Sequence, residues 1–205
     1  RCFYLSCQEP YRYPAQINLR IVRYNTGAID HRQRGDNLPP QIQFKNVTYY
    51  HPGADKTAPP ALNDINLTIE AGEWVAIVGA NGSGKTTLAR HCNALLAPSS
   101  GEVSIAGLDT RQPGNLAGIR AKVGIVFQNP EDQIVATFIE EDTAFGPENL
   151  ALPSQEIRSR VDSSLNLVKM WQQRDRPPHL LSAGQKQRVA LAGVLAMVPQ
   201  CIIFD

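Results

Sequence analysis

The stretch GANGSGKTT, residues 79–87, decides the fold. It fits the pattern G-x-x-x-x-G-K-[ST] and follows the short apolar run WVAIVG, which predicts a central strand buried on both faces. Glycines let the backbone curl so that its N–H groups point at a polyphosphate, and the helix that begins here adds the positive end of its dipole. Lys85 then meets the β- and γ-phosphates, while Thr86 offers a hydroxyl to Mg²⁺.

Composition bounds the class of protein. The chain has 205 residues, a formal net charge of +1 and 42% apolar residues, which is typical of a folded globular domain rather than a disordered or polyanion-wrapping one. Nucleic acid is therefore not indicated as a partner. The longest apolar run, VALAGVLAMV at 189–198, is shorter than the roughly 18 residues of a membrane span. If the protein works at a membrane, a partner must supply the span.

The cysteines indicate no disulfide framework. Cys2, Cys7, Cys92 and Cys201 show no C-x-x-C spacing and no histidine cluster beside them. Cys92 lies in a helical pattern and Cys201 in an apolar strand pattern, so we expect both to be small buried hydrophobes in a reducing compartment.

Two lobes are predicted along the chain. Residues 1–40 are an extension with little periodicity: a poorly ordered tail, the end of a preceding domain, or sequence outside the mature protein. Residues 41–205 form the domain proper, with strands and one helix first and a helical lobe later. The expected strands are IQFKNVTYY, INLTIE, WVAIVG, EVSIAG, VGIVFQ and CIIFD, the last a buried one. Four helices are expected. The first carries an apolar stripe of Leu88, Cys92, Leu95 and Leu96, and the second is the segment ATFIEEDTAFGPENL. The third is opened by Pro153 and Ser154 and carries Ile157, Val161, Leu165 and Val168, and the fourth runs from about Ala183 into Met197.

A second motif, LSAGQKQR, has the form of a capping box. Ser182 is followed three residues later by Gln185, ahead of an apolar helix, and alone this would be an ordinary helix start. The other motifs along the chain change this interpretation. A phosphate loop comes first, then Gln128 at the end of a strand, and Asp205 ends another strand where a ligand of magnesium or its waters would lie.

That order of motifs resembles the nucleotide-binding subunit of ATP-binding cassette (ABC) transporters. GANGSGKT corresponds to Walker A, VFQNP to the Q-loop, LSAGQ to the signature and CIIFD to the start of Walker B. The longer strings VFQNPEDQIVATFIEEDTAFGPENLALP and RPPHLLSAGQKQRVALAGVLAM are similar to the ATPase of energy-coupling factor (ECF) transporters, which import vitamins and cobalt or nickel ions. The resemblance implies an α/β P-loop NTPase fold of the ABC ATPase type. It comprises a RecA-like sheet core, an antiparallel β subdomain and a helical subdomain at about 129–185, incomplete at the C-terminus.

The resemblance also implies the site residues. An ATP phosphate chain would be held by Gly79, Asn81, Gly82, Ser83, Gly84, Lys85, Thr86 and Thr87, and Mg²⁺ with its waters by Thr86, Gln128 and Asp205. Ser182, Gly184 and Gln185 would face the γ-phosphate bound to the opposite subunit. His51 or Tyr50 would stack on adenine, and the sequence does not choose between them. The signature usually has glycine at Ala183; a helical conformation suits alanine, but its methyl group crowds the approach to phosphate if it points across the interface.

The acidic run at Glu140, Glu141 and Asp142 has two interpretations. It is a solvated helix face, or, as in the family, part of a groove with the Q-loop that receives coupling helices carrying arginines. The implied partners are a second ATPase, identical or paralogous, a transmembrane coupling subunit and a substrate-binding membrane subunit. The implied location is the cytoplasmic face of a prokaryotic membrane.

The end of the chain carries an expectation of its own. In the family a glutamate that orients the attacking water follows the aspartate corresponding to Asp205, and a histidine comes later. We therefore expect a fragment of an active ATPase that binds nucleotide but hardly hydrolyses it. The alternatives are a binding-only or regulatory cassette and a soluble ABC protein of repair or translation; the ECF-like strings disfavour the latter.

Overall fold

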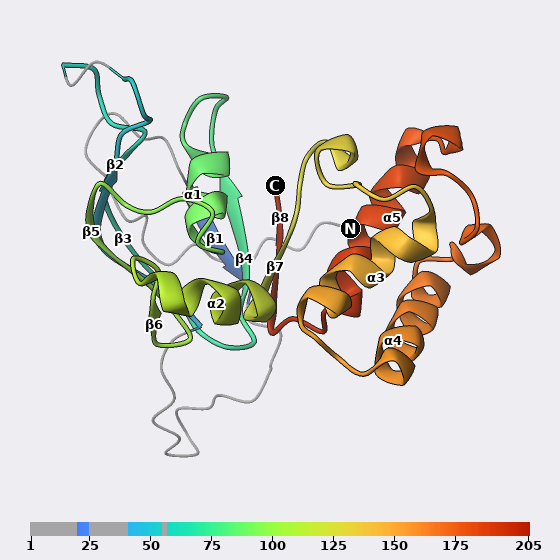
Figure 1. The fold of residues 1–205 in the computed structure, drawn as a ribbon. Coiled ribbons are helices and arrows are strands. Elements are labelled where there is room, and N and C mark those ends of the chain that lie inside the picture. Colours follow the sequence, from blue (N-terminus) through green and yellow to red (C-terminus); the bar gives the residue numbers. More distant parts are fainter. Residues whose placement is uncertain (1–19, 25–40, 55–56) are drawn as a thin grey trace. The chain divides into compact units, whose positions relative to one another are not determined.

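The computed structural model describes residues 20–24, 41–54 and 57–205, so Cys2, Cys7 and most of the predicted extension lie outside the described residues (Figure 1). The chain divides into two compact units, and the division passes through the helix α1 (Lys85–His91). The first unit runs to Leu88 and includes Ala97–Asp109, whereas the second comprises Ala89–Leu96 and Thr110–Asp205.

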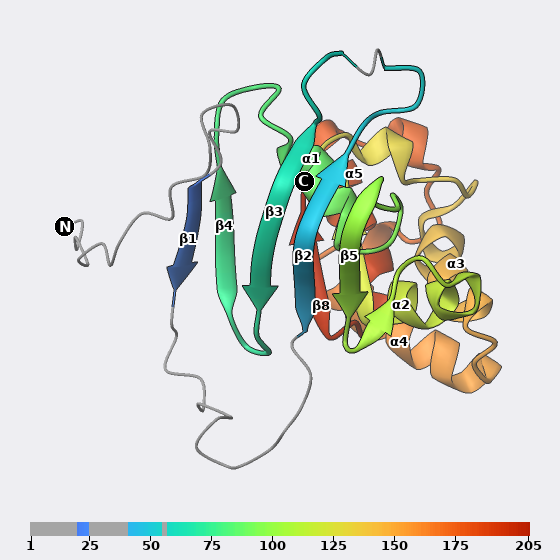
Figure 2. The same ribbon diagram turned by 90° about the vertical axis from the view of Figure 1, so that its left-hand side faces the viewer.

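A four-stranded antiparallel sheet forms most of the first unit. Its order is β3 (Leu62–Ile69), β2 (Ile42–Tyr49), β5 (Ser100–Ile105) and β6 (Leu108–Asp109), and Figure 2 shows β3, β2 and β5 side by side. Apolar side chains alternate with polar ones along these strands, which confirms the period-two prediction. The buried apolar side chains of these strands are Ile42, Phe44, Val47, Tyr49, Leu62, Ile65, Leu67, Val103 and Ile105.

The strand that leads into the phosphate loop differs from the prediction. β4 (Trp74–Val78) pairs antiparallel with β1 (Arg20–Tyr24) in a two-stranded sheet. Trp74 is 66% exposed and Val78 46% exposed, so the expectation of burial on both faces is wrong here. Pairing with β1 satisfies backbone groups along one edge of β4 but covers neither of its faces.

The helix after the loop is shorter than its apolar pattern suggested. α1 ends at His91, and the chain continues in turns, with Ala94 at a φ of 55°. Leu88 and Cys92 are buried as predicted, but Leu95 is exposed. A left-handed residue cannot continue an α-helix, and it rotates the following side chains off the stripe.

The second unit combines a parallel strand pair with a helical bundle. β7 (Val123–Val126) pairs with β8 (Cys201–Phe204), and α2 (Leu116–Lys122), which the sequence reading missed, leads into β7. The bundle comprises α3 (Ile139–Asn149), α4 (Ser154–Leu167) and α5 (Ala183–Ala196) (Figure 1). Short 3₁₀ turns lie at Pro113–Asn115, Pro130–Asp132, Trp171–Gln173 and Pro178–Leu180. The bundle core is Ile139, Val161, Leu165, Val168, Met170, Leu181, Val189 and Ala192.

The cysteines of the described residues differ in burial. Cys92 is buried, as predicted, and its pKa is raised by burial and by the nearby Cys201. Cys201 is only half-buried, and burial raises its pKa too. The prediction for Cys201 was thus too strong, because β8 is incompletely covered: Phe204 on the same strand is 65% exposed. Both residues are free thiols.

Along the residues that the structure describes, none of the helices is both long and apolar enough to cross a bilayer.

Candidate nucleotide site

The loop after β4 is shaped by two glycines with left-handed backbone. Gly82 has a φ of 79° and Gly84 a φ of 89°. A Cβ at Gly84 would lie 2.5 Å from the carbonyl oxygen of Ala61, whereas a Cβ at Gly82 would meet no atom within 4 Å. Gly84 is therefore required both for its φ and for the close approach to Ala61, and Gly82 for its φ alone.

Polar groups converge inside this loop. The Lys85 ammonium group donates hydrogen bonds to the carbonyl oxygens of Gly79 at 3.0 Å and Ala80 at 2.8 Å, which hold it over the loop. The Ser83 N–H donates to the Ala80 oxygen at 3.2 Å, and the buried Ser83 hydroxyl has no hydrogen-bond partner among the described residues. A buried hydroxyl without a partner costs free energy unless a ligand satisfies it. A cationic, donor-rich loop of this form fits a polyphosphate.

The two aromatic candidates differ in their surroundings. The His51 ring stands edge-on to Tyr49, with ring centroids 5.1 Å apart, and its Nε2 lies 3.5 Å from the Thr87 hydroxyl. Tyr50, by contrast, donates its N–H to the Ser99 hydroxyl, and its side chain is exposed. Of the two rings, the structure brings His51 into contact with the helix that carries Thr86 and Thr87.

Gln128 and Asp205 lie beyond the ends of neighbouring parallel strands. The Asp205 N–H donates to the Val126 oxygen at 3.0 Å, so the pairing of β7 with β8 extends to the aspartate. Carboxyl ends of parallel strands meet at one edge of a sheet, and Gln128, two residues after Val126, is exposed there. Thr86 belongs to the first unit, so the predicted magnesium set of Thr86, Gln128 and Asp205 draws on both units and stays a prediction.

The signature segment begins α5, and its capping box is confirmed. The Gln185 N–H donates to the Ser182 hydroxyl at 3.4 Å, and the Ser182 N–H donates to the Gln185 side-chain oxygen at 2.9 Å. Ala183 is the first helical residue, so alanine suits its backbone, and both it and Gly184 are exposed. The Gln185 amide nitrogen also donates to the Gln173 side chain at 3.1 Å. The Gln185 side chain is thus held by its own subunit, whereas Ser182, Ala183 and Gly184 present an open helix N-terminus.

The acidic run is not uniformly a solvated face. The Asp142 carboxylate is buried and accepts the N–H groups of Val135 at 2.8 Å and Ala136 at 3.1 Å, so it holds the preceding loop and is not offered to an arginine. Glu141 accepts the Phe138 N–H at 3.3 Å and Glu140 lies 3.7 Å from Arg174. For Asp142, therefore, the interpretation as a solvated helix face is wrong, and its carboxylate is already occupied by the two N–H groups.

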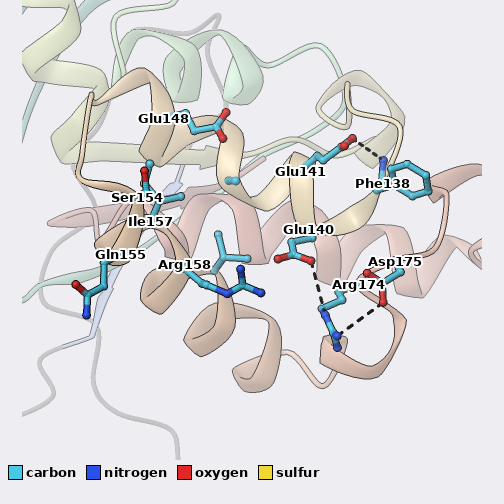
Figure 3. A pocket seen from close by; sticks show the side chains of 12 residues that line it. Phe138, Glu140, Glu141, Glu148, Ser154, Gln155, Ile157, Arg158, Arg174 and Asp175 are labelled. Carbon is cyan, nitrogen blue, oxygen red and sulfur yellow. Dashed lines mark hydrogen bonds and ion pairs between the residues drawn. The ribbon is translucent and has the colours of Figure 1, made fainter.

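An open cavity of about 740 Å³ lies on the helical bundle between α3 and α4 (Figure 3). Carboxylates and guanidinium groups line it together with apolar side chains, among them Glu140, Glu141, Glu148, Arg158, Ile157 and Phe138. Figure 3 shows Glu140 turned toward Arg174, which also lies 3.9 Å from Asp175. Among the residues drawn there, no hydrogen bond or ion pair joins Glu148 or Arg158 to another residue. The cavity therefore offers acidic and basic groups to a partner.

Sequence reasoning missed the side chains that hold the loop after β7. Gln133 and Gln187 each bond the backbone of Phe127, and Lys186 pairs with Glu131. A single sequence carries no signal for these contacts, because each joins residues on different elements.

Comparison with known proteins places the chain in a family. The model of the ABC transporter family matches residues 62–205. A protein named energy-coupling factor transporter ATP-binding protein EcfA1, from Caldanaerobacter subterraneus subsp. tengcongensis, is 52% identical over 164 residues, covering 80% of this chain and 59% of the relative. The EcfA of Methanosarcina acetivorans is 54% identical over 164 residues, covering 80% of this chain and 58% of that protein. The chain thus spans less than two thirds of these relatives.

Two solved structures share the fold. The cbiO1 protein of Clostridium perfringens, described as part of the ABC transporter complex cbiONQ, superposes with a TM-score of 0.67 at 35% identity, covering 81% of this chain and 65% of that one. The ATP-binding cassette MJ0796, a dimer in a post-hydrolysis state with ADP and Pi, gives a TM-score of 0.69 at 31% identity and covers 80% and 73%. The predicted fold class, a P-loop NTPase of the ABC ATPase type, is confirmed.

Proposed function

The chain belongs to the ABC transporter family, and on that premise we propose that it is the nucleotide-binding part of an ATPase subunit that energises an ECF-type importer. The observation that carries the proposal is the preformed phosphate loop, with Lys85 held over it and the Ser83 hydroxyl buried without a partner among the described residues. The imported solute in this proposal is a vitamin or a cobalt or nickel ion, as the resemblance implies.

Binding of ATP draws on the loop residues in distinct ways. The N–H groups of Gly82 to Thr86 surround the phosphate chain, and Lys85 exchanges the neutral carbonyl oxygens of Gly79 and Ala80 for phosphate oxygens. That exchange is favourable because a hydrogen bond between two charged groups is stronger than one to a neutral acceptor. The Ser83 hydroxyl gains its missing partner in the same step.

The adenine is assigned to His51. Its ring is already oriented by the edge contact with Tyr49 and by the approach to Thr87, so little freedom is lost when a base stacks on it. Tyr50 is the second choice, because its contact with Ser99 is made by its backbone N–H, whereas the His51 ring itself contacts Tyr49 and approaches Thr87. His51→Ala is therefore expected to weaken nucleotide binding more than Tyr50→Ala.

Magnesium, when bound with ATP, would neutralise charge on the β- and γ-phosphates. Thr86 provides a hydroxyl oxygen, Gln128 an amide oxygen and Asp205 a carboxylate, which are the hard oxygen ligands this ion prefers. The Asp205 backbone is fixed to Val126 on β7, and that fixed backbone limits where its carboxylate can reach.

The signature segment fits a role across a subunit interface. The exposed N-terminus of α5 attracts anions through the N–H groups of Ala183 and Gly184 and through the helix dipole, while the Ser182 N–H stays bonded to Gln185. If that anion is the γ-phosphate bound to a second ATPase subunit, identical or paralogous, ATP binding closes the dimer and hydrolysis releases it. The Gln185 side chain supports the helix start in this proposal and does not contact phosphate.

The cavity between α3 and α4 is proposed as part of the coupling surface. Glu148 and Arg158 offer charges at its rim, and Phe138 and Ile157 offer apolar area to a helix of the transmembrane subunit. In this proposal the protein works at the cytoplasmic face of the membrane. The substrate-binding membrane subunit would lie beyond the coupling subunit.

The test is MgATP turnover by the full-length protein co-expressed with its membrane subunits. Lys85→Ala is expected to reduce kcat/KM at least 100-fold, because the charged contact to the reacting phosphate is lost. Lys45→Ala, an exposed lysine on β2, is the matched control and should leave turnover unchanged. Turnover that survives Lys85→Ala, or solute uptake that survives without ATP, would contradict the proposal. ATP binding that closes a dimer without turnover would favour a binding-only cassette.

A further inference from the structure

The backbone of Phe127, the residue before Gln128, is held from both sides by glutamine side chains. Its N–H donates to the Gln133 side-chain oxygen at 3.2 Å, and its carbonyl oxygen accepts the Gln187 side-chain amide at 3.4 Å. β7 ends at Val126, so these two bonds replace the strand pairing that stops there. The position of Gln128 therefore depends on two side chains from elsewhere in the second unit.

Gln133 connects this point to the helix of the signature. Its side-chain nitrogen donates to the carbonyl oxygen of Ala190 at 2.9 Å, in the middle of α5, while its oxygen holds Phe127. Gln187 lies on the same helix. Gln133, through Ala190, and Gln187 thus both attach the backbone of Phe127 to α5, and Ser182 caps the N-terminus of that helix. A helix is stiff along its axis, so displacement of one end moves the other.

The loop between these anchor points is itself braced. The Asn129 side chain accepts the Glu131 N–H at 3.3 Å and donates to Asp132 at 3.1 Å. A hydrogen bond and ion pair with Lys186 on α5 hold the pKa of Glu131 below its ordinary value. Although the pair is exposed, it crosses from the loop to α5 beside the two glutamine contacts. All three contacts connect the same two segments.

We propose that Gln133 is a positioning residue that makes Gln128 move together with the signature helix. In this inference, which rests on the proposed function, the bond to Ala190 transmits displacement of α5 to the amide that attends Mg²⁺ and the attacking water. Gln133 itself touches no reacting atom. If Gln133 had only a structural role, it would be enough for the Phe127 N–H to keep a hydrogen-bond acceptor. Two substitutions distinguish this role from the transmitting one.

The substitutions divide the two hydrogen bonds of Gln133. Gln133→Glu keeps an oxygen acceptor for the Phe127 N–H but replaces the donor to Ala190 with a second oxygen, which repels that carbonyl group. Gln133→Met has nearly the same length and removes both bonds. Gln172→Glu adds the same charge at an exposed position and is the matched control. Thermal unfolding of each variant establishes whether it is folded.

Amide hydrogen exchange tests the link without any need for activity. In the full-length protein, the Phe127 amide should exchange about tenfold faster or more in Gln133→Met, and at nearly the wild-type rate in Gln133→Glu and Gln172→Glu. Unchanged exchange in Gln133→Met would mean that Gln133 does not hold Phe127, and the inference would be overturned. This measurement stands even if the protein proves not to hydrolyse ATP, in which case the proposed function fails and the link does not.

Steady-state kinetics then test what the link does. With the membrane subunits present, Gln133→Glu and Gln133→Met should both lower kcat about tenfold or more, because a displaced amide misorients water, while KM for MgATP changes less than about threefold. If Gln133→Glu retains the kcat of Gln172→Glu while Gln133→Met loses it, satisfying Phe127 is enough and the transmitting role is wrong.

Discussion

The phosphate loop and the loop that carries Gln128 reach their geometry by different routes. In the phosphate loop, Lys85 bonds carbonyl oxygens five and six residues earlier, and the left-handed glycines lie within the motif itself. In the second loop, Gln133 bonds a residue 57 positions later and Gln187 one 60 positions earlier. A loop held by local backbone contacts is a fixed cradle, whereas one held by a distant helix can follow that helix.

The largest expected effect breaks the locally built loop. Gly84→Ala forces a residue with a Cβ into a φ of 89° and against the Ala61 oxygen, so we expect a loss of about 3 kcal/mol or more of unfolding free energy, with loss of ATP binding. Gly82→Ala meets no atom and should cost only about 1 kcal/mol, from its φ alone. Urea unfolding and binding of a fluorescent ATP analogue measure both quantities. Equal losses for the two variants would show that the contact with Ala61 is unimportant.

The second effect acts on the distantly held loop. Asp142→Ala leaves the Val135 and Ala136 N–H groups without their acceptor, and the expected loss is about 2 kcal/mol of unfolding free energy. Glu148→Ala, on an exposed turn of the same helix, is the control and should change stability little. Urea unfolding compares the two. A loss in Glu148→Ala as large as that in Asp142→Ala would place the effect in the helix and not in the loop.

The third effect separates the stability of the signature from its function. Ser182→Ala removes the helix cap and should cost about 1 kcal/mol. Ser182→Asp restores a cap and should recover that stability, yet its carboxylate would repel a phosphate approaching the same N-terminus, so MgATP turnover should stay low. Thermal unfolding and turnover are measured on the same preparations. Recovery of turnover in Ser182→Asp would argue against a phosphate at this helix end.

The sequence predicted the regions whose geometry is local. The strand alternation of β2 and β3, the glycines of the phosphate loop and the capping box at Ser182 were all found, because each pattern lies within a few residues. The alanine in the signature also fits, since Ala183 begins a helix.

The failures came where burial or contacts depend on distant partners. The apolar run of β4 does not reveal that β1 pairs with it and leaves Trp74 exposed. Nor does the acidic run reveal that Asp142 turns inward to the loop while its neighbours stay accessible. The contacts of Gln133 are of the same kind, so the link to α5 became visible only in the fold.

The smallest expected effect sharpens the comparison of the two loops, because it changes a contact between the Gln128 loop and α5 at little cost in stability. The Lys186–Glu131 pair is exposed on the Glu131 side, so Glu131→Lys should lower the melting temperature by no more than about 2 °C, and less in high salt. The pKa of Glu131 is held below its ordinary 4.5 by Lys186, so the pair contributes above that value and its contribution is lost as the pH falls through the lowered pKa. A neutral replacement, Glu131→Gln, should therefore match the wild type at acid pH, whereas Glu131→Lys keeps a positive charge that repels Lys186 there. If the ion pair nevertheless helps α5 to carry Gln128, turnover near neutral pH will fall in Glu131→Lys and recover when Lys186→Glu is added, although neither single change unfolds the protein. Failure of the double variant to recover would leave Gln133 and Gln187 as the contacts that couple this loop to the helix.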